Sequence, residues 1–253
     1  MEVHHHAHTP RKKWTHYFWE FLMLFLAVFC GFLAENQREH MVEHTRERQY
    51  MQSMLVDLAA DTARFNSGIP LREDRIKSID TVFMFFKSNP NAKIISGKLF
   101  KDFRRTSYDQ NLVRNTITIN QLKNAGAMRL IRNKMVADSI ASYDFQFEYF
   151  VSLHGQYYLI HQQADFRHLE KLVNSSDLLA LYISNASAGI VNNISDTMSI
   201  HINTEGLNEL LNFLMQLKVY ARQQINQIKQ LKSKATNLMT LIKQKYHLSE
   251  ETP

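Results

Sequence analysis

The chain is poor in residues that break or cross-link a polypeptide. Its 253 residues include one cysteine, four prolines and seven glycines. A single cysteine excludes any disulfide within the chain. Scarce proline and glycine favour long helices over sheets that need many turns. The sequence therefore predicts an all-α protein with long helices.

Motifs typical of catalytic and nucleotide-binding sites are also absent. The sequence contains no G-x-S-x-G, no P-loop, no G-x-G-x-x-G and no C-x-x-C. The one cysteine, Cys30, lies inside an apolar run and is not placed to act as a nucleophile. We therefore expect no enzymatic activity, no cofactor and no catalytic residue.

The most informative feature is one long apolar run at residues 14–34. About 20 apolar residues at 1.5 Å per residue span a bilayer core. The bulky Phe32 lies where signal-peptide cleavage after Ala34 would need a small residue, and Phe29 precedes Cys30 where a lipoprotein signal would need one. We therefore predict an uncleaved transmembrane helix in contact with membrane lipids.

The charges around the apolar run predict its orientation. Arg11, Lys12 and Lys13 directly precede it, whereas the arginines after it lie further away, among glutamates. Because cations near a span favour the cytoplasmic side, the N-terminus is expected in the cytoplasm. The predicted organisation is a short basic, His-rich cytoplasmic tail at 1–13, a transmembrane helix at 14–34, a charged helical stalk at 35–50 and an extracytoplasmic helical bundle domain at 51–253.

Glu20 is an ionisable residue one turn inside the apolar run. Such a residue is by default a candidate for function in the membrane. It also lies near the predicted cytoplasmic interface, one turn after His16, where it can snorkel or pair with that histidine. The second interpretation is the simpler one.

Glycine, proline and hydrophobic periodicity place the remaining elements. Gly68 and Pro70 are expected to end the first helix. A loop is expected in the Asn- and Ser-rich stretch around Gly189, where alternating Met198, Ile200 and Ile202 also allow a short strand. The predicted helices are 14–66, 71–87, 97–106, 117–125, 130–172, 176–184 and 205–246.

The last predicted helix has the clearest periodicity in the chain. Its apolar residues follow a 3-4 spacing, which is typical of a seam that packs against another helix in a bundle or coiled coil. The seam comprises Leu207, Leu210, Leu214, Leu217, Ile228, Leu231, Leu238 and Ile242. It can pack within one chain or form the interface of a homo-oligomer. The simplest architecture is a transmembrane helix that continues into an elongated antiparallel helical bundle with long, coiled-coil-like helices.

The same helix has a basic face that includes Lys218, Arg222, Lys229 and Lys232. A basic helix can bind nucleic acid or another anionic surface, but charge on an exposed face is also usual for a solvated helix. The predicted orientation removes nucleic acid from reach. Expected partners are therefore membrane lipids, a second copy of the chain or an envelope protein. Reversed topology would instead indicate a membrane-tethered nucleic-acid binder.

His154, His161 and His168 recur every seven residues in the predicted helix 130–172, and Asp165 lies one turn from His161. Three interpretations remain open. In the first, the histidines are polar residues between helices with their hydrogen bonds satisfied. In the second, they titrate at about pH 6.5 and their protonation loosens the packing. In the third, they bind a transition metal in a metal-dependent enzyme or metal-binding bundle. Di-iron bundles use paired Glu-x-x-His elements, which the chain lacks on suitable helices. The first interpretation is therefore favoured.

A second histidine pattern, His40-Met41-Val42-Glu43-His44, matches the H-x-x-E-H pattern of one class of zinc peptidases. On a helix, His40 and His44 share one face and Glu43 would be the base. The pattern lies on the predicted stalk, without pocket-forming sequence around it. We therefore do not expect a zinc site there.

Two stretches resemble a known group of proteins. These are FWEFLMLFLAVFCGFLAENQREH at 18–40 and TINQLKNAGAMRLIRNKMVADSIASYD at 118–144. The second contains the pattern Leu122, Gly126, Leu130, Ile131, Asn133 and Tyr143. Together they resemble a group of uncharacterised single-pass inner-membrane proteins of Gram-negative bacteria. The resemblance implies an N-terminal anchor and a helical periplasmic domain, but no activity. The sequence thus predicts a role in interaction, scaffolding or sensing.

Overall fold

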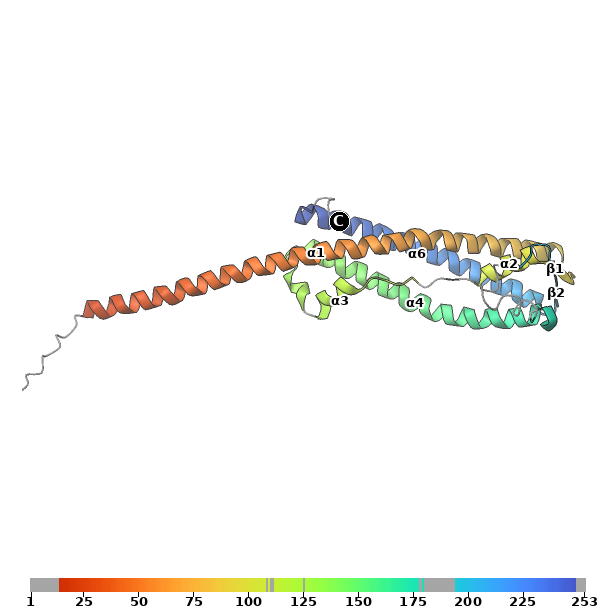
Figure 1. Ribbon diagram of the computed structural model, residues 1–253, viewed down its shortest axis with the longest axis horizontal. Coiled ribbons are helices and arrows are strands. Elements are labelled where there is room, and N and C mark those ends of the chain that lie inside the picture. The colour runs from red at the N-terminus through yellow and green to blue at the C-terminus, as the bar shows by residue number, and fades with distance from the viewer. Residues whose placement is uncertain are drawn as a thin grey trace, which may run out of the picture. The chain divides into compact units, whose positions relative to one another are not determined.

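The computed structural model describes residues 14–107, 109, 112–124, 126–177, 179 and 194–248, with only the backbone described at 162, 165, 166 and 169. The chain divides into two compact units, Met1–Tyr50 and Met51–Pro253, called here the small unit and the large unit. The described elements are α1 (Trp14–Ser88), β1 (Ile94–Ser96), α2 (Gly97–Thr106), α3 (Ile117–Asn124), the 3-10 helix η1 (Ala127–Leu130), α4 (Lys134–Leu172), β2 (Ser199–His201) and α6 (Leu207–Tyr246) (Figure 1). The prediction of a mostly helical chain is confirmed.

The predicted helix break at Gly68 and Pro70 is wrong, because α1 runs through both residues. Proline inside a helix removes one hydrogen bond and crowds the preceding turn, at a cost of about 3 kcal/mol. Here Pro70 is exposed, whereas Phe65 before it and Arg72 after it are buried. The Arg72 guanidinium also donates to the Gly68 carbonyl at 3.1 Å. Burial on both sides of the proline therefore keeps the helix continuous.

The first part of α1 has the composition of a membrane span. Among the described residues, α1 is the helix long and apolar enough to cross a bilayer, and none of its most apolar stretch is buried. Phe21 and Leu24, for example, are 66% and 69% exposed. In water such exposure is unfavourable, so it agrees with a segment that contacts lipid. Within this segment the His16 Nε2 and Glu20 Oε1 atoms lie 3.2 Å apart.

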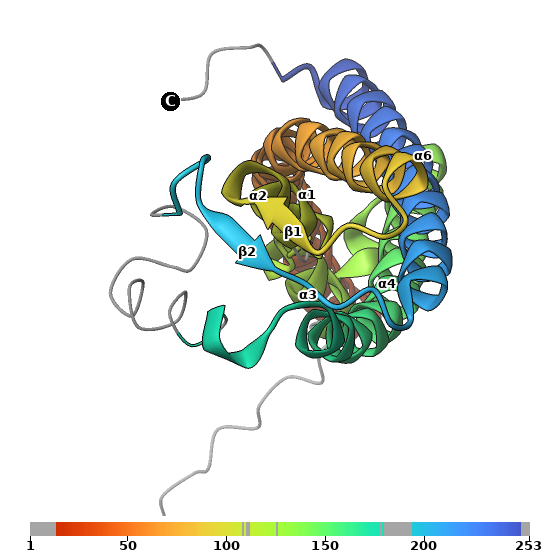
Figure 2. The same ribbon diagram turned by 90° about the vertical axis from the view of Figure 1, so that its right-hand side faces the viewer.

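In the large unit, α4 and α6 lie side by side and run in opposite directions (Figures 1 and 2). Near one end Lys171 of α4 donates to Glu209 of α6 at 3.2 Å. Towards the other end Lys234 of α6 donates to Ser142 of α4 at 2.9 Å. These two contacts show that α4 and α6 form an antiparallel pair.

The large-unit part of α1 packs against both α4 and α6. The rings of Phe65 and Phe147 of α4 lie 5.8 Å apart. Further along, Asp80 of α1 forms an ion pair with Lys218 of α6. The apolar faces of the three helices thereby close over a shared core, in which Phe65, Phe147 and Leu214 are nearly inaccessible to solvent.

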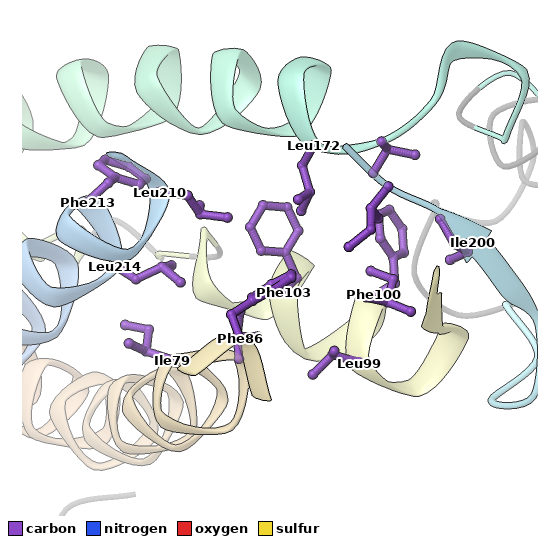
Figure 3. Close-up of a cluster of buried hydrophobic side chains, with 14 of the residues drawn as sticks. Ile79, Phe86, Leu99, Phe100, Phe103, Leu172, Ile200, Leu210, Phe213 and Leu214 are labelled. Atoms are coloured by element: carbon purple, nitrogen blue, oxygen red, sulfur yellow. The ribbon is translucent and has the colours of Figure 1, made fainter. Parts of the chain in front are cut away.

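A compact apolar cluster lies where α1 ends, next to the two short strands (Figure 3). The strands pair antiparallel, with Ile95 opposite Ile200. Gly97 follows β1 at a close approach of backbones, since a Cβ there would lie 1.9 Å from the Ser195 carbonyl oxygen. The cluster includes Ile79, Phe86, Leu99, Phe100, Phe103, Leu172, Ile200, Leu210 and Leu214.

Candidate functional site

A cavity of about 630 Å³ lies in the large unit beside α4. Apolar atoms make up most of its lining surface, although nine of its sixteen lining residues are polar or charged. A concave, mostly apolar surface with placed polar groups is typical of sites for small organic molecules, which have volumes of about 300–1,000 Å³. The apolar lining includes Leu112, Val113, Ile119, Phe147, Phe150 and Val151.

Five parts of the chain form the cavity. α4 lines it from Asp144 to Gly155, a length of about 16 Å at 1.5 Å per residue. Facing α4 are the start of α3 and the irregular segment 112–116, which we call the strap. Arg72 of α1 and Gln224 of α6 complete the lining. The cavity is thus elongated along α4.

Side chains of α1 fasten the strap and the start of α3. The Asp61 carboxylate accepts a hydrogen bond from the Asn115 backbone N–H at 3.0 Å, and Asp57 accepts one from the Thr118 backbone N–H at 3.0 Å. The Tyr143 hydroxyl of α4 also donates to Asp61, at 2.8 Å. Burial raises the pKa of Asp61, although the hydrogen bonds from Asn115 and Tyr143 oppose the rise. The strap is therefore fixed through its backbone.

Arg114 of the strap is buried in the cavity wall, with its side chain 7% exposed. Its guanidinium donates to Asp144, which also pairs with Lys123. Its Cζ lies 5.2 Å from the centroid of the Tyr143 ring and 5.4 Å from that of Phe147. Burial alone would raise the pKa of Asp144, but the hydrogen bonds from Lys123 and Arg114 outweigh it and lower that pKa. Asp144 is thus ionised, and its ion pair with Arg114 holds that side chain in the cavity wall.

A second buried ionic group lies beside Gln224. Arg72 and Arg75 of α1 approach the Asp109 carboxylate at 3.0 and 3.3 Å. The Gln224 Nε2 donates to the same carboxylate at 3.0 Å. Burial lowers the pKa of Arg72, and Asp109 opposes that change. Two guanidinium groups therefore share one carboxylate next to Gln224.

Among the described residues of the cavity lining, Arg114 and Gln224 each hold a polar atom without a partner. Within the part of the chain that the structure describes, Arg114 Nε and Gln224 Oε1 are buried and have no hydrogen-bond partner. A buried polar group left in this state costs about 1–3 kcal/mol. Both side chains line the same cavity, so a polar ligand bound there is in a position to remove that cost.

His154 also lines the cavity, and contacts engage both of its ring nitrogens. Nδ1 lies 2.8 Å from the Tyr220 hydroxyl, and Nε2 contacts the Gln227 side-chain oxygen. Since that oxygen can only accept, Nε2 carries the proton and Nδ1 accepts from Tyr220. Burial lowers the pKa of His154. The ring is thus held neutral, as expected for a satisfied polar residue between helices.

The other two helix histidines lie among aromatic rings. His161 contacts the rings of Tyr157 and Tyr220, and His168 lies 4.7 Å from the ring of Phe213. The side chain of Asp165 lies outside the described residues. Among the described side chains, no group of three His, Cys, Asp or Glu residues is placed to hold a metal. The geometry therefore does not assemble these histidines into a metal centre.

The H-x-x-E-H pattern lies on α1 in the small unit. There the His40 Nδ1 and Glu43 Oε2 atoms are 4.0 Å apart, and both side chains are substantially exposed. The described residues bring no third ligand to this pair. An exposed helix surface does not supply the enclosed pocket that a zinc peptidase requires.

The predicted seam of α6 lies in the core of the large unit. Leu207 is partly buried, and the other members, from Leu210 to Ile242, are buried. The predicted basic face divides into two kinds of residue. Lys218 is held in the ion pair with Asp80 of α1, whereas Arg222 and Lys229 are exposed. The seam thus packs within the chain.

The cavity and its buried charges do not follow from the sequence patterns. The lining comes from α1, the strap, α3, α4 and α6, so no local pattern marks it. One indication was available, because Phe65, Arg72 and Ile79 are spaced by seven and share one helix face. An arginine in an apolar register predicts a buried charge that needs a partner. Its partner, Asp109, lies in a segment without periodicity.

Comparison of the chain with family models, with curated proteins and with solved structures gave no match. The function is therefore inferred from the geometry of the chain itself. That geometry combines an exposed apolar helix segment with a helical unit that contains an elongated cavity with a mostly apolar surface.

Proposed function

We propose that this chain is a single-pass protein of the bacterial inner membrane, whose large unit is an extracytoplasmic helical bundle that acts in interaction, scaffolding or sensing. The exposed apolar stretch of α1 carries the proposal, because such a surface is stable in lipid and unfavourable in water. The long antiparallel helices α4 and α6, with the buried seam, support a bundle with coiled-coil-like packing.

Among these three roles, the cavity favours sensing. The cavity of about 630 Å³ opens at the surface of the large unit, where the lining residues Val113 and Val151 are 67% and 46% exposed. A concave, mostly apolar site of this size with placed polar groups is typical of a site that binds a small molecule. Binding of a small molecule is the first step of sensing.

The orientation is tested with a compartment-sensitive reporter fused after Pro253. The cations before the span predict a cytoplasmic N-terminus, and therefore a reporter that is active in the periplasm. Replacing Arg11, Lys12 and Lys13 with glutamine should lower the periplasmic signal, while the unmodified fusion serves as the control. Removing 14–34 should release the chain from the membrane fraction.

A reporter active in the cytoplasm would overturn the proposed orientation. In that case the exposed Arg222 and Lys229 would face nucleic acid, and the nucleic-acid hypothesis would replace the extracytoplasmic one. Recovery of the full chain in the soluble fraction would contradict the membrane anchor itself.

A further inference from the structure

We propose that the cavity of the large unit binds a medium-chain carboxylic acid, with the apolar chain along α4 and the carboxylate at Arg114. This ligand class rests on the sensing role proposed for the cavity and not on the membrane anchor. It concerns contacts inside the large unit and holds for either orientation in the membrane, so its failure and that of the proposed topology appear in different experiments.

The shape and lining of the cavity select an elongated apolar body. The α4 wall extends for about 16 Å and presents Phe147, Phe150 and Val151. The facing wall presents Leu112 and Ile119. Each Å² of apolar ligand surface removed from water contributes about 25 cal/mol. An alkyl chain that follows α4 uses the whole length of this lining.

Arg114 selects the head group. A guanidinium has five N–H donors in a fork that matches a carboxylate, and its Nε has no partner within the described residues. Asp144 does not prevent binding, because Lys123 contacts both Asp144 and Glu148. Asp144 therefore keeps a cationic partner while Arg114 turns towards a ligand carboxylate.

Gln224 is expected to favour a ligand with a hydrogen-bond donor at the end of its alkyl chain. Its amide orientation is fixed because Nε2 donates to Asp109, so the unpartnered atom is an acceptor, Oε1. Across the antiparallel pair α4 and α6, Gln146 contacts Gln230 and Ser142 contacts Lys234. The same register places Gln224 opposite about residue 152 of α4. Arg114 lies over Tyr143 and Phe147, so the two side chains are separated by about 10 Å along the axis of α4. A hydroxyl at the end of the alkyl chain is therefore expected to strengthen binding.

The ligand class is tested by calorimetric titration of the full chain in lipid nanodiscs, with empty nanodiscs as the blank. The probes are decanoate, decan-1-ol and 10-hydroxydecanoate, which share one alkyl chain. We expect decanoate to bind at least about 10-fold more tightly than decan-1-ol, because hydrogen bonds to charged groups contribute about 1.5–3 kcal/mol. We expect 10-hydroxydecanoate to bind more tightly than decanoate.

Two variants assign the binding to this cavity. Arg114→Met should remove the preference for the acid over the alcohol and keep the binding of decan-1-ol. Val151→Trp should fill the cavity and weaken all three probes at least about 10-fold. The matched control is Leu159→Trp, on the exposed side of α4 and outside the cavity lining, and it should bind like the wild type. Circular dichroism confirms that each variant is folded.

Equal affinity for decanoate and decan-1-ol would overturn the proposal. So would wild-type affinity in Val151→Trp, because the probes would then bind elsewhere. If Arg114→Met fails to fold, the comparison of Val151→Trp with Leu159→Trp, together with the acid and alcohol affinities, decides the question.

Discussion

At the scale of single residues, His154 shows how burial controls charge in the large unit. Its ring lies between Tyr220 and Gln227, and each ring nitrogen contacts an oxygen atom. Either oxygen can accept a hydrogen bond from a protonated ring, and the contact with Gln227 by itself raises the pKa of His154. Burial outweighs this effect and lowers that pKa, because a charged ring loses its hydration.

The lowered pKa predicts how stability changes with pH. In the unfolded chain a histidine protonates near pH 6.5, whereas the folded ring protonates only at lower pH. The unfolded chain therefore binds more protons, and the free energy of unfolding falls as the pH drops below about 6.5. We expect His154→Gln to reduce this loss, measured by denaturant unfolding between pH 7.5 and about 5.

The matched control is His247→Gln, because His247 is exposed just after α6. This variant should keep the wild-type dependence on pH. His161 shares the direction of the pKa shift of His154, so the loss should be reduced in His154→Gln and not abolished. An identical slope in the wild type and His154→Gln would show that His154 makes no contribution.

Single residues also mark where sequence reasoning succeeds and where it fails. The buried position of His154 follows from its register with Ile140 and Phe147, which are spaced by seven. The burial of Arg114 does not follow from any register. Its place in the cavity wall depends on the backbone of the strap, which Asp61 fixes at Asn115, and on the start of α3, which Asp57 fixes at Thr118, both from more than 50 residues away. A contact of that kind leaves no local pattern.

At the scale of elements, the helices with a continuous apolar face are the ones that the sequence predicts well. The bounds of α2 match the prediction, because Ser96 caps its start by accepting from the Leu99 N–H at 3.2 Å. The predicted helix 130–172 begins later, at Lys134, after the 3-10 helix η1. The predicted helix 176–184 lies mostly outside the described residues. Strand β1 was missed because three residues are too few to show alternation.

The seam of α6 gives the sharpest prediction at this scale. Leu214 and Leu231 are fully buried, and an aspartate in either place would remove apolar contacts and bury a charge. Each of Leu214→Asp and Leu231→Asp is expected to lower the free energy of unfolding by more than about 4 kcal/mol, or to prevent folding. Thermal unfolding followed by circular dichroism measures the effect.

Ser233→Asp is the control for the two seam variants, since Ser233 lies on the same helix and is exposed. Its effect should stay within about 0.5 kcal/mol. Unchanged helicity, melting and oligomeric state in both seam variants would contradict the assignment of the seam to the core.

At the scale of the whole molecule, the two units predict how the chain tolerates truncation. The large unit has its own buried core and begins at Met51, inside α1. Removal of 1–50 should therefore leave a folded, water-soluble unit with a cooperative thermal transition. Removal of 1–88 should abolish that transition, because it also removes Phe65 and Ile79 from the core. Aggregation of the 51–253 fragment would contradict the independence of the large unit.

The atoms of the strap that hold it in place differ from the atoms that line the cavity. Asp57 and Asp61 accept hydrogen bonds from the backbone N–H groups of Thr118 and Asn115. Every residue type except proline has such a group. The side chains of Leu112 and Val113, by contrast, line the cavity and take no part in these hydrogen bonds. Substitution of these two side chains is therefore expected to change which molecule the proposed site accepts, while the helices that hold the strap stay the same.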